Sequence, residues 1–247
     1  MLTLRRGTVT AIAERHDGLV RLAVDARPCV AYPELTGPVA LGDDVLVNVQ
    51  AVELGLGSGG YDVLHANLTR GLGLAAEPGA HVMKLPYTSL QHAVAHAEES
   101  GGAEGGRPLA GMPVVCCSLH SQVGPACAGL GSEVGVAYVQ LPGGALPVPL
   151  SDSVRALRES ELLRLTVAAG ACFGGELAAV SAASALAACA RAGAGAVVCA
   201  IGPGIVGTGS RYGHGGLAAA DAAVAAAALG GVAIVAPRIS EADPRER

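Results

Sequence analysis

The first 70 residues contain short hydrophobic runs in which apolar and polar positions partly alternate. Clusters of turn-forming residues separate the runs, among them His16-Asp17-Gly18, Gly37-Pro38 and the glycine-rich segment 55–60. Alternation with a period of two predicts strands that bury one face. The pattern therefore predicts a small all-β unit, a barrel or a sandwich, over residues 1–70. The five expected strands lie in LTLRRGTVTAIAE, LVRLAVD, CVAYPEL, DDVLVNVQAVEL and YDVLHANL.

The pattern changes after residue 111. Continuous apolar runs of strand length, such as PVVCCSL and AVVCAI, alternate with longer alanine-rich stretches. Strands without alternation are buried on both faces, which is typical of parallel sheets covered by helices. Residues 112–247 are therefore expected to form an α/β body, with a mostly parallel sheet flanked by alanine-rich helices. The remaining expected strands are VGVAYVQL, LTVAAG and VAIVAP, and the expected helices lie in residues 151–163, 174–193 and 216–231.

Residues 71–111 form the expected connection between these two parts. A strand is predicted in HVMKLPY, and Thr88 and Gln91 then fit a capping box that opens a helix to about Glu99. The glycine-rich stretch SGGAEGGRPLAG is expected to complete the connection as a flexible linker.

Two histidines on the expected connecting helix raise the question of a metal site. His92 and His96 are four residues apart and would share one helix face. Ala93 stands where the zinc-binding motif H-E-x-x-H has its glutamate. A solvated helix face is therefore favoured, and no metal site is predicted.

Composition and charge narrow the possible partners. Of the residues, 51% are apolar and 15% are charged, with a net charge of −5. Blocks of Lys or Arg are missing and aromatic side chains are few, so a general nucleic-acid binder is not expected. The longest apolar stretch, residues 217–229, is nearly all alanine and contains Asp221, which favours a buried helix over a membrane span. A charged fraction of 15% leaves much of the surface of a monomer of this size without charged side chains. We therefore expect a homo-oligomer, most simply a two-fold dimer.

Cysteine usage points to a reducing compartment. The chain has seven cysteines, an odd number, which lie in apolar segments without a C-x-x-C pair. Cysteine is therefore expected as a small core residue, with Cys116 and Cys117 on opposite faces of one strand. No apolar stretch of the signal-peptide type follows the charges of the N-terminus, so a cytoplasmic location is expected.

Candidate sites follow from the expected parallel sheet, in which ligands bind at the carboxyl ends of strands. This rule selects residues 118–123, 170–176 and 202–216. In the second of these the backbone could approach a ligand closely, but a turn that places Glu176 in the first turn of the next helix is favoured.

The third segment, GPGIVGTGSRYGHGG, holds seven glycines in fifteen positions. Its first three glycines satisfy G-x-G-x-x-G, but no helix opens there and no acidic residue ends the next strand, so a dinucleotide site is weakly supported. Backbone N–H groups, hydroxyls and a cation near a helix start still suit a small anion such as phosphate or carboxylate. The alternative is a connector whose glycines serve turns, and no cofactor is identified. The expected ligand-binding residues are Gln122, Gly202, Gly204, Gly207, Thr208, Gly209, Ser210, Arg211 and His214.

The segment SLHSQVGP offers candidate catalytic groups at the end of a buried strand. His120 is the candidate general acid or base, and Ser121 or Ser118 the candidate nucleophile or orienting hydroxyl. The sequence does not identify a carboxylate that would orient His120, and the G-x-S-x-G elbow is missing. The alternative is a polar turn whose side chains cap the following helix. We expect this segment and residues 202–216 to share one sheet edge and one anion pocket, in which bound negative charge raises the pKa of His120.

The sequence is compatible with three functions. The first is an enzyme, a hydrolase or transferase acting on a small anionic molecule at the glycine-rich loop. The second is a non-catalytic binding or regulatory module that uses the same loops. The third is a structural subunit whose alanine-rich helices form an oligomer interface.

The chain resembles the uncharacterised bacterial domain-of-unknown-function 3866 family. The resemblance is carried by AYPELTGP, AVELGLGSGGYD, HVMKLPYTSLQ, LHSQ, GPGIVGTGS and RISEADPRER, which are spread over nearly the whole chain. It implies an N-terminal β region and an α/β body, and it carries no established activity. The resemblance also implies that members continue past the DPRER segment into a histidine-containing stretch, whereas this sequence ends at Arg247.

Overall fold

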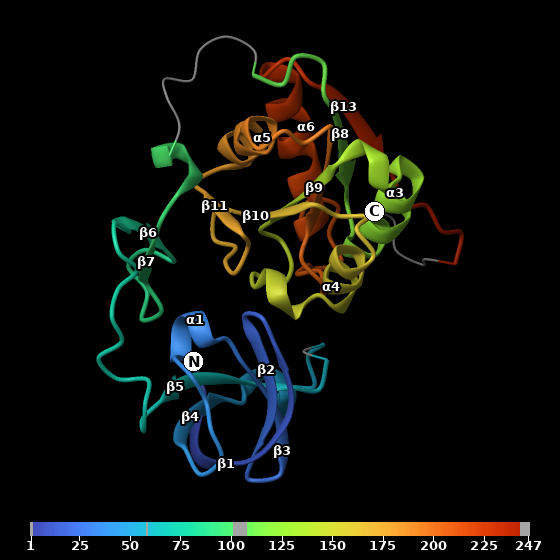
Figure 1. Cartoon of the computed structure of the whole chain (residues 1–247). Coiled ribbons are helices and arrows are strands. Elements are labelled where there is room, and N and C mark those ends of the chain that lie inside the picture. The colour runs from blue at the N-terminus through green and yellow to red at the C-terminus, as the bar shows by residue number, and fades with distance from the viewer. Residues whose placement is uncertain (1, 58, 101–107, 243–247) are drawn as a thin grey trace. The chain divides into compact units, whose positions relative to one another are not determined.

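A computed structural model describes residues 2–57, 59–100 and 108–242 of the chain (Figure 1). The chain divides into two compact units, Met1–Pro78 and Gly79–Arg247. Residues 101–107 of the expected glycine-rich linker lie outside the described residues. Within the described part, no helix combines the length and the apolar character needed to cross a bilayer.

The first unit is a closed five-stranded barrel, as the sequence predicts. Its strands follow the order β1-β2-β3-β5-β4, and all neighbours are antiparallel except β3 and β5. The long strand β1 carries two register shifts where it pairs with β2, and it pairs with β4 through its first half, so it closes the barrel. The elements are β1 (Leu4–His16), β2 (Leu19–Val24), β3 (Arg27–Ala31), α1 (Pro33–Thr36), β4 (Asp44–Asn48), α2 (Gln50–Glu53) and β5 (Asp62–Asn67).

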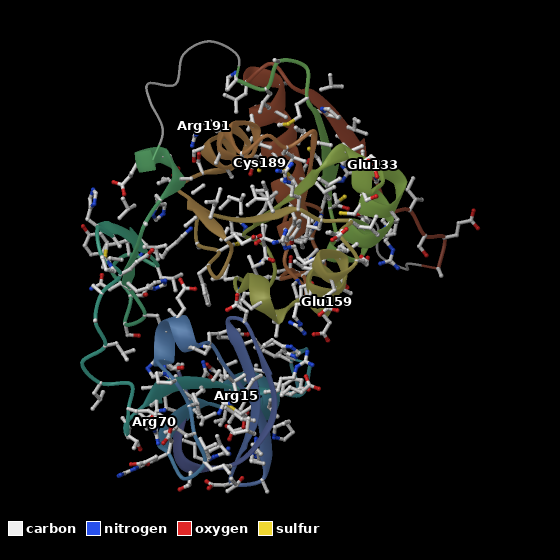
Figure 2. All side chains as sticks on the ribbon, viewed as in Figure 1. Arg15, Arg70, Glu133, Glu159, Cys189 and Arg191 are labelled. Atoms are coloured by element: carbon white, nitrogen blue, oxygen red, sulfur yellow. The ribbon has the colours of Figure 1, made fainter. Side chains whose placement is uncertain are left out.

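A buried polar cluster surrounds Asp43 in the barrel. This carboxylate is 1% exposed and accepts hydrogen bonds from the Arg70 Nε, the Asn67 Nδ2 and the Ala40 backbone N–H at 2.8 to 2.9 Å. Arg70, labelled in Figure 2, also forms an ion pair with it at 2.7 Å. Burial raises the pKa of Asp43, but these hydrogen bonds and the charge of Arg70 outweigh burial and hold the pKa below its ordinary value. The cluster therefore ties the turn before β4 to the end of β5.

The second unit is built on a six-stranded sheet in the order β11-β10-β9-β12-β8-β13, and every pairing is parallel. The prediction of an α/β body with a parallel sheet is confirmed. The strands are β8 (Pro113–Cys117), β9 (Val136–Leu141), β10 (Leu165–Ala169), β11 (Leu177–Ala179), β12 (Ala196–Ile201) and β13 (Val232–Ala236). A separate two-stranded sheet consists of β6 (Val82–Lys84) and β7 (His92–Val94).

Helices cover the two faces of this sheet in pairs (Figure 1). Helices α3 and α4 share one apolar core with Cys117, and α5 and α6 share the other with Cys116, so the two neighbouring cysteines do face opposite sides. The helices are α3 (Val123–Leu130), α4 (Asp152–Glu159), α5 (Ala182–Arg191) and α6 (Ala218–Ala228). Short 3-10 helices are η1 (Ala97–Ser100), η2 (His120–Gln122), η3 (Ser132–Val134), η4 (Val148–Leu150) and η5 (Gly215–Leu217).

The strand order places a topological switch point between the neighbours β9 and β12. The chain leaves β9 through α4 on one face of the sheet, and it leaves β12 through α6 on the other face. Diverging connections of this kind leave a crevice at the carboxyl ends of the strands. This edge is therefore the place to look for a site.

The prediction of a helix from Thr88 to Glu99 is wrong. Gln91 Oε1 accepts the N–H of Tyr87 at 3.1 Å, one residue before the expected N-cap Thr88, and this bond closes a tight turn. The chain after the turn pairs with β6, with His92 beside Lys84, and forms β7. Strand pairing and the burial of Lys84 thus override a local helix signal.

The two histidines of that segment consequently share no helix face. His92 lies edge-on against Phe173 with ring centroids 6.1 Å apart. His96 is 3% exposed, and its Nδ1 lies 2.9 Å from the Val94 carbonyl oxygen. The described residues contain no group of three or more His, Cys, Asp or Glu side chains that would hold a metal ion.

The helix expected over residues 174–193 is also shorter than predicted. It begins at Ala182, because Ser181 and Ser184 form the capping box. The preceding residues form β11, and Glu176 accepts hydrogen bonds from the Thr166 N–H and hydroxyl at 2.9 and 3.2 Å. Glu176 is therefore bound to β10 and does not lie in a first helical turn, as the sequence had suggested.

The Asp43 cluster generates the first prediction. Asp43→Ala leaves the groups that bind the carboxylate unpaired, so we expect the free energy of unfolding of the barrel to fall by about 2 kcal/mol at pH 7. The pKa of Asp43 is depressed in the folded state, so this stabilisation is present above the unfolded pKa of about 4 and is lost as the pH falls below it. The measurement is urea unfolding of the full chain at pH 7 and pH 3.5, followed by hydrogen exchange of the barrel amides. Asp17→Ala, at an exposed turn, is the control, and equal stability of the two variants would contradict the prediction.

Candidate functional site

The segments that follow β8 and β12 meet at the carboxyl edge of the sheet. The two strands are parallel neighbours, so their following segments leave on the same side. His120 Nδ1 lies 3.1 Å from the Ile201 carbonyl oxygen, and a side chain at Gly216 would approach the Ser118 carbonyl oxygen to 2.8 Å. The prediction that residues 118–122 and 202–216 share one edge is confirmed.

His120 is held in one tautomer by its neighbours. The Ile201 carbonyl oxygen accepts only, so Nδ1 carries the proton and donates it. Nε2 is then an acceptor, and it lies 2.6 Å from the Ser151 Oγ, which donates its proton to the ring. The arrangement resembles a serine-histidine pair in which a backbone carbonyl takes the orienting role of the carboxylate.

Ser151 is a residue that the sequence analysis did not single out. It is the N-cap of α4 and accepts the Val154 backbone N–H at 3.0 Å with the same Oγ. The residue is only 2% exposed, so its hydroxyl is enclosed by the protein. A serine followed by an acidic residue at the start of a predicted helix was a visible N-cap signal, but nothing in the sequence connected it to His120.

Two polar side chains from the buried strand β9 extend the network. The Tyr138 hydroxyl lies 3.4 Å from His120 Nδ1 and 3.2 Å from the Gln140 Oε1. The Gln140 Nε2 donates to the carbonyl oxygens of Ala145 and Leu146 at 3.0 and 2.9 Å. Tyr138 and Gln140 are completely buried, and polar residues inside an otherwise apolar run were a sequence signal that pointed to them.

Burial sets the protonation of His120. Desolvation lowers the pKa of the ring, and the hydrogen bond to the Ile201 carbonyl offsets part of this effect. The ring is therefore neutral near pH 7. The expected rise of this pKa beside a bound anion stays a prediction.

The other candidate groups of this segment form no hydrogen bond with the His120 ring among the described residues. The Ser118 hydroxyl donates to the Gln122 Oε1 at 3.2 Å, and the same oxygen accepts the Leu119 N–H at 2.9 Å. The Gln122 Nε2 donates to the Ala236 carbonyl oxygen at 2.6 Å, which joins η2 to the end of β13. Ser121 is exposed, and its hydroxyl has no hydrogen-bond partner among the residues that the structure describes. Ser118 and Gln122 thus act as capping and bridging groups.

The glycines at the base of the 202–216 segment allow two backbones to touch. The segment 142–147 after β9 packs against it, with hydrogen bonds from the Ala145 N–H to the Pro203 oxygen and from the Val206 N–H to the Gly143 oxygen, both 3.0 Å. A side chain at Gly202 would approach the Ala145 carbonyl oxygen to 2.0 Å. The crevice of the switch point is therefore filled by the protein's own backbone. The same close approach holds at Gly143, Gly144 and Gly215.

The remainder of the segment is a hairpin that projects from this base. Gly207 and His214 form an antiparallel bridge, and the Thr208 N–H donates to the Gly213 oxygen at 2.6 Å. The side chain of Thr208 orders the tip, since its Oγ1 lies 2.8 Å from the Ser210 Oγ. We call residues 208–212 the hairpin tip, and all of them are exposed.

Arg211 and His214, two of the expected ligand-binding residues, differ in how accessible their side chains are to a ligand. Arg211 lies at the tip, and no described residue forms an ion pair with it. The His214 ring lies against Gly216, and its Nδ1 is buried without a hydrogen-bond partner among the described residues. Arg211 is therefore the accessible charged group of this segment.

A buried lysine lies near the same edge. Lys84 is 2% exposed, and its Nζ donates to the carbonyl oxygens of Ala168, Gly170 and Ala179 at 3.0, 2.8 and 3.3 Å. It thereby anchors β6 to the ends of β10 and β11. Burial raises the pKa of the nearby Cys172 to about 12, although the charge of Lys84 opposes this, so Cys172 is a protonated core thiol.

A shallow groove of about 670 Å³ lies at the opposite, amino edge of the sheet. Its charged side chains include Glu133 from η3 and Glu159 from the end of α4, both labelled in Figure 2. Arg158 and Arg164 also line it, so charges of both signs are mixed there. It holds none of the expected site residues.

The lowered pKa of His120 generates the second prediction. Because burial lowers its pKa in the folded state, the unfolded chain binds the proton first as the pH falls below about 6.5. The free energy of unfolding should therefore decrease between pH 7 and pH 5.5, and His120→Gln should make this decrease smaller. The measurement is urea unfolding at the two pH values. Ser121→Ala, at an exposed neighbour whose hydroxyl does not titrate in this pH range, should keep the wild-type pH dependence, and the same dependence in His120→Gln would contradict the prediction.

Comparison with known proteins gives a family and no function. None of the curated proteins and none of the solved structures compared with the chain matches it. The family described as "Protein of unknown function (DUF3866)" matches residues 28–247, nearly the whole chain. The strand end that carries His120, the glycine-rich hairpin and the buried Lys84 all lie within the matched residues. The chain therefore belongs to the DUF3866 family.

Proposed function

We propose that the protein is a non-catalytic module that binds a small anionic molecule at the hairpin tip. One observation carries the proposal. Ser151, Tyr138 and Gln140 behind the carboxyl edge are buried and hydrogen-bonded within the protein, whereas the tip offers an exposed guanidinium, that of Arg211. A phosphate or a carboxylate is the chemistry that such a site takes, because a guanidinium binds both through two parallel hydrogen bonds.

The construction of the hairpin supports binding. Its base is fixed to the sheet by backbone hydrogen bonds, and its tip is ordered by the contacts between Thr208 and Ser210. A site that is already ordered loses less conformational entropy when a ligand binds. A Cβ added at Gly209 would meet no heavy atom within 4 Å beyond its chain neighbours, so the space beside this glycine is open to a ligand.

A cytoplasmic location is part of this proposal. All seven cysteines are free and buried, and burial raises the pKa of Cys116 and Cys127 to about 11. Thiols that remain protonated and enclosed fit a reducing compartment.

The third prediction tests the site with two changes at the tip. Phosphate, a sugar phosphate and a dicarboxylate are added in turn to the full chain in a thermal-shift assay, and the anion that binds should raise the melting temperature. A ligand at a hundred times its Kd adds about 2.7 kcal/mol of stability. Arg211→Gln and Gly209→Val should each abolish the shift, by removing the charge and by covering the backbone.

A control variant makes this test specific. Arg164→Gln removes an exposed arginine at the amino edge and should leave the shift intact. Gly204→Val is a poor probe, because the φ of +72° at Gly204 strains any side chain and lowers stability by itself. The proposal would be contradicted if Arg211→Gln kept the rise in melting temperature, or if none of the three anions raised it.

Serine hydrolysis is the second candidate function, favoured by the 2.6 Å contact between His120 Nε2 and Ser151 Oγ. A neutral histidine that accepts the serine proton is the ground state of such a reaction. The 2% exposure of Ser151 opposes it, because a nucleophile must reach its substrate. The oxygen also caps α4, which ties it to the backbone.

The fourth prediction separates the two functions. Under the binding proposal, a fluorophosphonate probe should label the native protein no more than Ser151→Ala does, because the hydroxyl is enclosed. Intact-mass spectrometry after incubation at pH 8 is the measurement, and Ser118→Ala serves as the control for a neighbouring serine. Labelling that disappears in both Ser151→Ala and His120→Gln would establish the hydrolase instead.

A further inference from the structure

One end of the barrel carries charged side chains at its mouth. Strands β1 and β3 are both antiparallel to β2, and β3 is parallel to β5, so β1, β3 and β5 begin at the same end of the barrel. Arg5 is the second residue of β1, and Arg27 and Asp62 are the first residues of β3 and β5. These three residues therefore lie at one mouth, and we call them the mouth cluster.

The strand register places the mouth cluster on the inner face of the barrel. Residues that pair directly across two strands point to the same face of a sheet. Each member of the cluster pairs with a residue that belongs to the apolar core of the barrel. Small barrels fill their interior with side chains, and charged groups there cost free energy unless they are paired. The pairs are Arg5 with Val47, Arg27 with Val24 and Asp62 with Cys29.

Asp62 holds both arginines of the cluster with a single oxygen. The residue is 2% exposed, and its Oδ2 accepts hydrogen bonds from the Arg5 Nη2 and the Arg27 Nε, both at 3.2 Å. The side chains of Arg5 and Arg27 are 31% and 42% exposed, so they reach solvent. Neither arginine donates a hydrogen bond to another described residue. One guanidinium is enough to neutralise Asp62, so the pair keeps one charge and several N–H donors for an outside acceptor.

A second carboxylate, that of Asp25, lies at the same mouth. Asp25 belongs to the two-residue turn between β2 and β3, and its Oδ1 accepts the Thr8 N–H at 3.1 Å. A Cβ added at Gly7 would overlap the Asp25 Oδ2, so this oxygen lies over the inner-face position that follows Arg5 on β1. The Asp25 Oδ2 has no hydrogen-bond partner among the described residues, and no ion pair joins Asp25 to Arg5 or Arg27.

We propose that this mouth binds the zwitterionic end of a free amino acid. The ligand carboxylate would accept hydrogen bonds from the guanidiniums of Arg5 and Arg27, and the ligand ammonium would donate to the Asp25 Oδ2. This site lies in the barrel and the hairpin tip lies in the second unit, so the inference is independent of the proposed function.

The charges of the mouth select a zwitterion over a plain ion. The mouth cluster and Asp25 together contain two guanidiniums and two carboxylates, so their formal charges sum to zero. Asp25 repels an anion that approaches the arginines, and the arginines repel a cation that approaches Asp25. A molecule with one charge of each sign meets an opposite charge at both of its ends.

The unused hydrogen-bonding groups of the mouth are complementary to the same ligand. A carboxylate accepts two parallel hydrogen bonds from a guanidinium, and Arg27 keeps both terminal nitrogens because it binds Asp62 through Nε. An ammonium has three N–H donors, and the Asp25 Oδ2 lacks a donor. The Asp62 Oδ1 is enclosed and also has no partner among the described residues. Both kinds of group that the mouth lacks are therefore present in an amino acid.

The fifth prediction compares three small molecules on the full chain. Glycine carries both charged groups, whereas acetate and methylammonium each carry one. Glycine should change the chemical shifts of the backbone amides of residues 5–8 and 24–27 in a saturable way. It should bind about tenfold more tightly than either of the other two, because each of those leaves one side of the mouth unpaired. Titrations followed by nuclear magnetic resonance are the measurement.

Two variants that keep the barrel intact test the residues. Arg27→Gln and Asp25→Asn should each weaken glycine binding about tenfold. In Arg27→Gln, Arg5 still pairs with Asp62. In Asp25→Asn, the amide oxygen still accepts the Thr8 N–H, and asparagine tolerates the φ of +47° at this position.

Arg6→Gln is the matched control. Arg6 follows Arg5 directly but lies on the outer face of β1, where it binds Asp44, so this variant should keep the wild-type affinity for glycine. If acetate bound as tightly as glycine, the mouth would be a plain anion site and the proposal would be overturned. It would also be overturned if glycine left the amide signals unchanged, because the mouth cluster would then serve only to close the barrel.

Discussion

The close approach of two backbone segments at the switch point governs the carboxyl edge of the sheet. The segments after β9 and β12 touch so closely that a side chain at Gly202 or Gly215 would overlap a carbonyl group of the other segment. This contact fills the crevice in which α/β sheets usually bind ligands. It also fixes the Ile201 carbonyl that orients His120, and it forms the base from which the hairpin projects.

Buried polar groups in both units are paired with groups that hold distant segments together. Asp43 joins the turn before β4 to the end of β5, Lys84 anchors β6 to the ends of β10 and β11, and His120 links β12 to the start of α4. A buried polar group without a partner costs free energy, so such groups are retained where they bind several partners at once. At the carboxyl edge this pairing leaves few side chains free for chemistry, which is why we propose the exposed hairpin tip, and not the serine-histidine pair, as the ligand site.

The second unit distributes its apolar surface unevenly. Its central strands are covered on both faces, whereas β13 and Val224 of α6 remain exposed among the described residues. The low charge of the chain and this local exposure have the same physical cause, because alanine-rich helices supply few polar side chains for a solvated face.

The sequence by itself determined the five strands of the barrel, the parallel sheet and most of the α/β helices. These follow from the period of apolar residues, which reports local burial directly. It also placed His120 and the glycine-rich segment at one edge, because the carboxyl ends of parallel strands lie on the same side.

Tertiary structure decided which residues bind one another. Ser151 lies 31 positions from His120, and Lys84 bonds to carbonyls 84 to 95 positions away. It also turned the expected helix after Thr88 into a strand, since pairing with β6 and burial of Lys84 outweighed a capping signal that extends over only four residues. Contacts between residues far apart in the chain leave no periodic trace in the sequence, so only the folded structure shows which side chains the close-packed glycines bring together.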